Sequence, residues 1–77
     1  MSYEKTKIAI HYRMRGAKMF KAAEAMNFAI DYHNGKRKDG SPEFSHQIFI
    51  SNFAVTLPIY DNSIMETLLS AIFLHDV

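Results

Sequence analysis

The 77-residue sequence contains no cysteine and no tryptophan. The absence of cysteine excludes disulfide bonds, thiolate zinc sites and cysteine nucleophiles together. A chain without cysteine also fits a reducing compartment, and we expect a cytoplasmic protein.

A strong charge imbalance and a long apolar run are also missing. The formal net charge is +1, which gives no global field that would favour nucleic-acid binding. Arg13, Arg15 and Lys18 with the basic loop 36–38 offer the one arrangement for it, so we expect no nucleic-acid partner. No apolar run approaches the roughly 18 residues that span a bilayer, and MSYEKTKIAI at the start lacks the apolar stretch of a signal peptide. We therefore expect a soluble chain with no membrane partner.

The composition is that of a globular protein, with 48% hydrophobic and 22% charged residues. The length allows one domain, residues 1–77. A domain this small buries only about 60% of the surface of its unfolded chain. We expect marginal stability, which a second copy or another protein would raise by covering apolar surface.

Helical periodicity dominates the first half of the chain. A first helix is predicted from Tyr3 to Arg15, ended by Gly16, and a second from about Ala17 to Asn34. Apolar residues of the second recur at steps of three and four and predict one buried face: Met19, Ala22, Ala23, Met26, Ala29, Ile30 and His33. Gly35 stands where a left-handed C-terminal cap is favoured.

Two further helices are predicted in the second half. Ser41-Pro42-Glu43 suits the start of a third helix that ends near Pro58, and Ser63-Ile64-Met65-Glu66 matches a capping box at the start of a fourth. The third has an apolar stripe of His46, Phe49, Ile50, Phe53, Ala54 and Leu57, and the fourth one of Met65, Leu68, Leu69, Ile72, His75 and Asp76. Val55-Thr56-Leu57 would also suit a strand but has no convincing partner. We predict an all-α bundle of about four helices.

Both of these stripes contain residues that can bind metal. His46 opens the third stripe, while His75 and Asp76 close the fourth. If the two helices pack antiparallel, these side chains converge at one end of the core. Two imidazoles and a carboxylate suit a borderline divalent cation, which can activate water and polarise a phosphoryl oxygen. The alternatives are a hydrogen-bonded core histidine at position 46 and a histidine at 75 that interacts with the helix dipole.

A basic loop precedes the third helix. Lys36, Arg37 and Lys38 lie between two glycines, where they could hold a pyrophosphate or stack on a base. A solvated run of charges is the more frequent explanation of such a loop. His33, just before it, either supports the core or orients the loop.

FAIDYHNGKRKDGSPEFSH (28–46) and AIFLHDV (71–77) together resemble the opening of the RelA/SpoT-type HD hydrolase domain, especially small phosphohydrolase-like proteins of phages and plasmids. The resemblance covers roughly residues 22–77. It implies an all-α HD fold, of which this chain matches the N-terminal part. It also implies that His46, His75 and Asp76 bind Mn²⁺, and that Arg37 and Lys38 face a guanosine polyphosphate, (p)ppGpp, whose 3′-pyrophosphate the family removes.

The sequence departs from that family in three ways. The loop between His33 and Arg37 is slightly shorter than in the family. The stretch from His46 to His75 is longer, with residues 57–63 as the expected insertion. The Glu-Asp pair and the later aspartate ligand of active relatives do not follow Asp76. The hydrolase reading therefore predicts little or no turnover by this chain. The competing hypothesis is a non-catalytic, for example phage-encoded, inhibitory or regulatory protein that uses half of an HD fold as an interaction module. Its candidate apolar surface comprises Phe49, Phe53, Leu69, Ile72 and Phe73.

Overall fold

A computed structural model describes residues 3–36, 38, 40, 42–75 and 77. Within these residues the chain forms four α-helices and no strand, so the all-α prediction is confirmed. The helices are α1 (Tyr3–Gly16), α2 (Phe20–Tyr32), α3 (Ser45–Ala54) and α4 (Asn62–Leu74). None of the described helices is both long enough and apolar enough to cross a bilayer.

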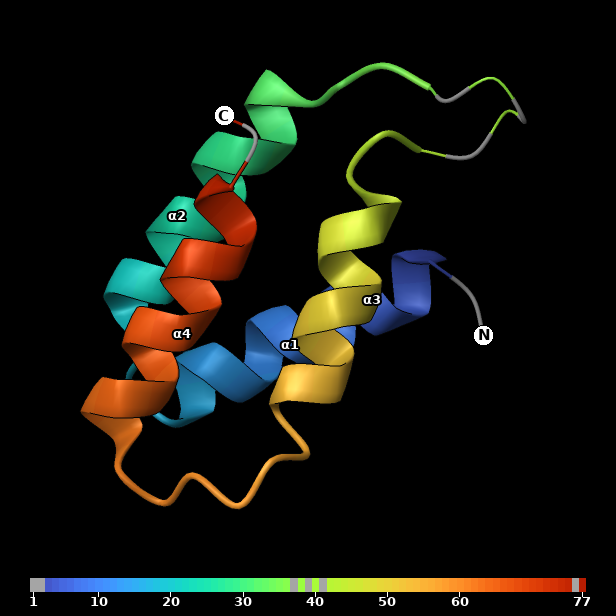
Figure 1. The fold of residues 1–77 in the computed structure, drawn as a ribbon. Coiled ribbons are helices and arrows are strands. Elements are labelled where there is room, and N and C mark those ends of the chain that lie inside the picture. The colour runs from blue at the N-terminus through green and yellow to red at the C-terminus, as the bar shows by residue number, and fades with distance from the viewer. Residues whose placement is uncertain (1–2, 37, 39, 41, 76) are drawn as a thin grey trace.

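The helices pack in a ring in which each one touches two others (Figure 1). α2 and α4 lie side by side with the most extensive packing, α3 runs antiparallel to α4, and α1 packs against both α2 and α3. The core between them is built from apolar side chains that are less than a tenth exposed. Its fully buried members include Met14, Met26, Phe44, Ile48, Leu69 and Phe73.

The predicted buried face of α2 is confirmed. Met19, Ala22, Ala23, Met26 and Ala29 are buried, and Ile30 packs partly buried against them. The predicted cap at Gly35 is wrong, because the described backbone has positive φ only at Lys18 and Gly40. The helix ends two residues earlier, where the N–H of His33 donates to the Ala29 carbonyl. A Cβ at position 35 would lie 3.3 Å from Oε2 of Glu43, a tight contact that this half-exposed side chain can relieve by a small shift.

The predicted start of α3 is wrong, and its predicted stripe is wrong except at Ala54, which is buried, and Ile50, which is partly buried. The helix begins at Ser45, after the proposed Ser-Pro-Glu start, and its N-cap Phe44 makes no side-chain capping bond. Phe49 and Phe53 are 49% and 66% exposed, and Leu57 is exposed as well. The buried side of this helix is formed by Ser45, Gln47, Ile48, Ser51 and Ala54. α1 and α4 pack on this polar side of α3, and hydropathy periodicity alone did not indicate it.

The predicted fourth stripe is confirmed for its described members, but its capping box is wrong. Met65 and Leu69 are buried, and Leu68 and Ile72 are partly buried. Asp61 is the N-cap, and its carboxylate accepts hydrogen bonds from the N–H groups of Ser63 and Ile64. Glu66 turns to another helix: its Oε2 accepts from the backbone N–H groups of Lys21 at 3.0 Å and Ala22 at 3.3 Å.

Candidate metal site

The structure brings His46 and His75 together. Their ring centroids lie 5.5 Å apart, with the planes inclined by 66°. His46 stands in the first turn of α3, and His75 caps the C-terminus of α4. The antiparallel arrangement of these helices places the start of one beside the end of the other (Figure 1). The predicted convergence of these two imidazoles is therefore observed, although they are 29 positions apart in the sequence.

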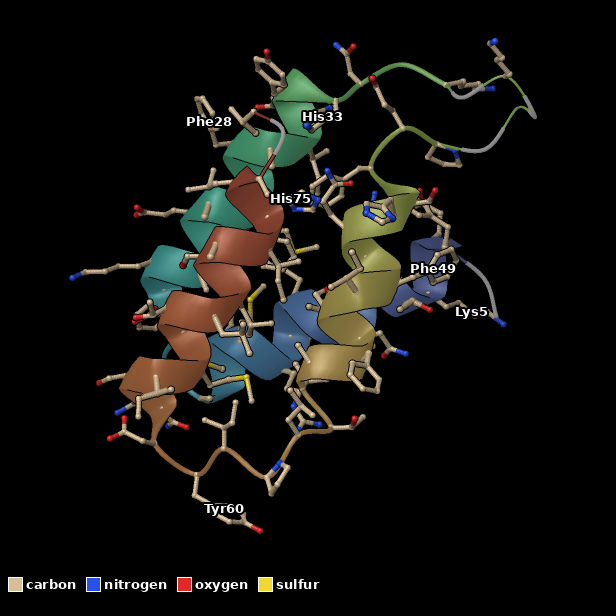
Figure 2. The ribbon with its side chains drawn as sticks, in the orientation of Figure 1. Lys5, Phe28, His33, Phe49, Tyr60 and His75 are labelled. Carbon is tan, nitrogen blue, oxygen red and sulfur yellow. The ribbon has the colours of Figure 1, made fainter. Side chains whose placement is uncertain are left out.

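The backbone of α4 fixes the proton of His75. Its Nδ1 lies 2.5 Å from the Ile72 carbonyl oxygen. A carbonyl oxygen only accepts, so this contact assigns the donor role to Nδ1. A histidine that binds a metal through one nitrogen commonly donates the other N–H to a backbone carbonyl in this way. His75 is labelled in Figure 2, where it lies at the upper end of α4.

The two imidazoles differ in exposure. His46 is exposed and His75 is half-buried. The donor set fits two of the ligands of a borderline divalent cation such as Mn²⁺, Zn²⁺ or Fe²⁺. The predicted third ligand, Asp76, lies outside the described residues. Among the residues that are described, no group of three or more histidine, cysteine or acidic side chains could hold a metal ion.

The basic loop is closed at its base just before α3. The Glu43 N–H donates to the Gly35 carbonyl at 3.0 Å, and Lys36 forms an isolated bridge with Pro42. Lys36 and Lys38 are both exposed. Arg37, predicted to contact substrate together with Lys38, lies outside the described part of the chain. These two backbone contacts close the loop immediately before α3. Lys36 and Lys38 therefore lie in the segment that leads into the helix of His46.

His33 is part of the core rather than of the histidine pair. Its side chain is only 10% exposed, and its ring stacks on Phe44 with centroids 6.4 Å apart. Phe44 in turn stacks on Phe73 of α4 at 6.0 Å. Nδ1 of His33 lies 3.9 Å from a Glu43 carboxylate oxygen. These contacts favour the structural reading of His33, which ties the end of α2 to the loop base and to α4.

Sequence reasoning missed Glu43 and Phe44 as supports of this region. Glu43 had been assigned to the start of α3, whereas it pairs with the backbone of Gly35 across the loop. Phe44 precedes the helix and belongs to no periodic stripe, yet it is 1% exposed. In the sequence, the one feature that marks Phe44 is its position two residues before His46. That spacing does not by itself indicate a buried support.

Comparison with known proteins adds no further constraint. No family model matches the chain, and no curated protein or solved structure matches it. The fold and the histidine pair are therefore the observations on which function has to be argued.

Proposed function

We propose that this chain has the metal site of an HD-type, metal-dependent nucleotide phosphohydrolase, with His46 and His75 as two of the metal ligands. One observation carries the proposal. The ring centroids of His46, at the start of α3, and His75, at the end of α4, lie 5.5 Å apart. The resemblance of residues 28–46 and 71–77 to the RelA/SpoT-type domain supports it, and that resemblance names the substrate class as guanosine polyphosphates.

The chain's own residues have separate tasks in this proposal. His75 would bind the metal through Nε2, since its Nδ1 lies against the Ile72 carbonyl, and His46 would supply the second imidazole. Asp76 would complete the set of ligands. Lys36, Arg37 and Lys38 would attract the phosphates of the nucleotide through charge-assisted hydrogen bonds. When bound, the divalent cation supplies Lewis-acid polarisation of a phosphoryl oxygen.

Metal binding is the decisive measurement. Titration with MnCl₂ should broaden the ring-proton NMR signals of His46 and His75 before those of His11 and His33, because paramagnetic broadening is greatest near the ion. His46→Gln and His75→Gln should each weaken binding by about tenfold or more. His11→Gln is the matched control on α1 and should leave affinity unchanged. Equal broadening of all four histidines would contradict the site.

Catalysis is a separate measurement. Incubation with Mn²⁺ and ppGpp tests for release of pyrophosphate, and we expect little or none. The carboxylates that active relatives supply after the His-Asp pair do not occur in this sequence. Fast release that survives His46→Gln would show that the activity resides elsewhere.

A second candidate function is a protein-interaction module, and the exposed aromatic side of α3 favours it. Phe49 and Phe53 are 49% and 66% exposed, and Phe49 lies on the side of α3 away from α4 (Figure 2). Leu69 and Phe73, also predicted for this surface, are fully buried, and Ile72 is partly buried. Those three residues cover the core of the single chain, so the candidate surface is reduced to the two phenylalanines.

Self-association is the form of this function that we would test first. α3 contains no Asp, Glu, Lys or Arg, so pairing two copies through it brings no like charges together. Light scattering over a range of concentrations should then show a dimer that Phe49→Ser with Phe53→Ser converts to monomer. If the protein is a monomer at every concentration and captures no partner, the interaction hypothesis is wrong and only the hydrolase hypothesis remains.

A further inference from the structure

A pocket opens between α1 and α2, and none of its lining residues belongs to the histidine pair or the basic loop. The two helices meet at the short turn 17–19, where Lys18 has a φ of 61°. The pocket residues come from the middle of α1 and the last part of α2, away from that turn. Its volume of about 420 Å³ lies within the range of about 300–1,000 Å³ that small-molecule sites occupy.

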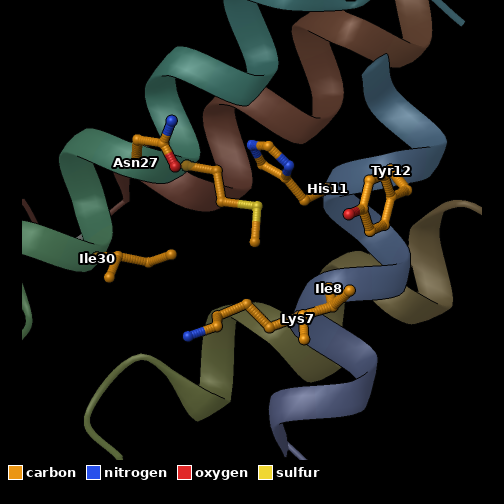
Figure 3. Close-up of a pocket in the computed structure, with 7 residues that line it drawn as sticks. Lys7, Ile8, His11, Tyr12, Asn27 and Ile30 are labelled. Atoms are coloured by element: carbon orange, nitrogen blue, oxygen red, sulfur yellow. The ribbon is translucent and has the colours of Figure 1, made fainter. Parts of the chain in front are cut away.

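Both helices contribute side chains to the lining of the pocket. α1 contributes Lys7, Ile8, His11 and Tyr12. The side chains of Lys7 and His11 point toward α2 in Figure 3. α2 contributes Asn27 and Ile30. Positions 7 and 11, like 26 and 30, are one helical turn apart, so each pair shares one helix face.

The floor and the rim differ in chemistry. Met26 is 1% exposed and belongs to the core, and Ile30 packs partly buried against that core. An apolar ligand group placed against Met26 and Ile30 would gain van der Waals contacts with side chains that already pack on the core. The polar side chains around it are an ammonium, an imidazole, a phenol and an amide, and no carboxylate from the described part of the chain lines the pocket.

Lys7 supplies the charge at the pocket, and among the described residues it is the one charged side chain in the lining. Its Nζ lies 3.1 Å from the Glu4 carboxylate and 5.3 Å from the centroid of the Tyr3 ring, and the side chains of Lys7 and Glu4 are 24% and 65% exposed. A pair three positions apart on a helix surface is weak, so a carboxylate that enters the pocket can compete with Glu4 for the ammonium. His11 and Asn27 add hydrogen-bonding groups on either side.

We propose that this pocket binds a small amphipathic carboxylate. The hydrocarbon part lies on Met26 and Ile30, and the carboxylate pairs with Lys7 between His11 and Asn27. The site is independent of the histidine pair, so it holds whether or not the chain binds metal.

The experiment is an amide NMR titration with 4-phenylbutyrate, compared with the neutral alcohol 4-phenylbutan-1-ol. The acid should cause saturable shifts at residues 7–12 and 26–30, and the alcohol should bind more weakly. Lys7→Met, which keeps the apolar stem, should reduce affinity about three- to fivefold. Lys21→Met removes an exposed lysine outside the pocket and should have no effect.

Two further variants keep the test decisive if Lys7→Met unfolds. Asn27→Trp fills the pocket from an exposed position and should abolish binding, while Glu4→Gln removes the competing carboxylate and should bind at least as tightly as the parent chain. Unsaturable or scattered shifts would overturn the proposal. Equal affinity for the alcohol, or an affinity that Lys7→Met leaves unchanged, would overturn it too. Broadening of the same signals with protein concentration alone would assign the groove to a second copy.

Discussion

Glu66 offers the sharpest test of how this small fold is held together, because one carboxylate of α4 caps a different helix. Phe20 is the first residue of α2, and Met19 before it makes no side-chain capping bond. Glu66 accepts from Lys21 N–H at 3.0 Å and Ala22 N–H at 3.3 Å. These are donors that a serine or aspartate N-cap would normally satisfy. Glu66 therefore replaces a missing local cap and fastens α4 to the start of α2.

The magnitude follows from those two bonds. Loss of an N-cap costs about 0.5–2 kcal/mol, and the negative charge at the helix start adds about 0.3–1 kcal/mol. The Lys21 N–H is exposed and would regain a water partner, whereas the Ala22 N–H is partly buried. We therefore expect Glu66→Ala to lower the free energy of unfolding by about 1.5 kcal/mol. In a domain of this size that corresponds to a fall in Tm of about 6–12 °C.

The assay is urea and thermal unfolding followed by circular dichroism. Glu66→Gln keeps an acceptor oxygen but loses the charge, so its stability should fall between those of the parent and Glu66→Ala. Glu24→Ala is the matched control, because it removes one negative charge from an exposed position of α2 itself. If Glu66→Ala and Glu24→Ala agree to within about 0.5 kcal/mol, a spread usual for surface substitutions, the cross-helix cap contributes nothing.

Two further predictions concern Gln47 and Tyr3. Gln47 is 3% exposed, and its Oε1 has no hydrogen-bond partner within the described residues. Gln47→Met should therefore raise the free energy of unfolding by about 1 kcal/mol, and a lower urea midpoint would refute this. Burial, and secondarily the Glu4 carboxylate, raise the pKa of Tyr3 above its ordinary 10.0. The unfolded chain releases that proton first, so the contribution of Tyr3 to stability is complete below pH 10.0 and declines as pH rises through the folded pKa. Tyr3→Phe should lose less stability than the parent between about pH 8 and about pH 11, as measured by urea unfolding. Equal losses would contradict the assignment.

The sequence by itself determined the helical class and two of the buried faces. α2 and α4 carry apolar residues at regular steps of three and four, and each packs against the other, so periodicity and burial agree. The sequence placed His46 and His75 at one end of the core only on the condition that their helices pack antiparallel. The tertiary structure met that condition, because α3 and α4 run antiparallel (Figure 1).

Only the tertiary structure decided which side of α3 is buried. Hydropathy favoured the face with Phe49 and Phe53, yet the packing against α1 and α4 buries Gln47, Ile48 and Ser51 instead. Burial depends on which neighbours a helix meets, and a single helix does not specify them. Glu66 shows the same limit, because a capping motif read along one helix cannot reveal that its carboxylate satisfies the N–H groups of another. The α1–α2 pocket also exists only in the tertiary structure, because two helices contribute its lining.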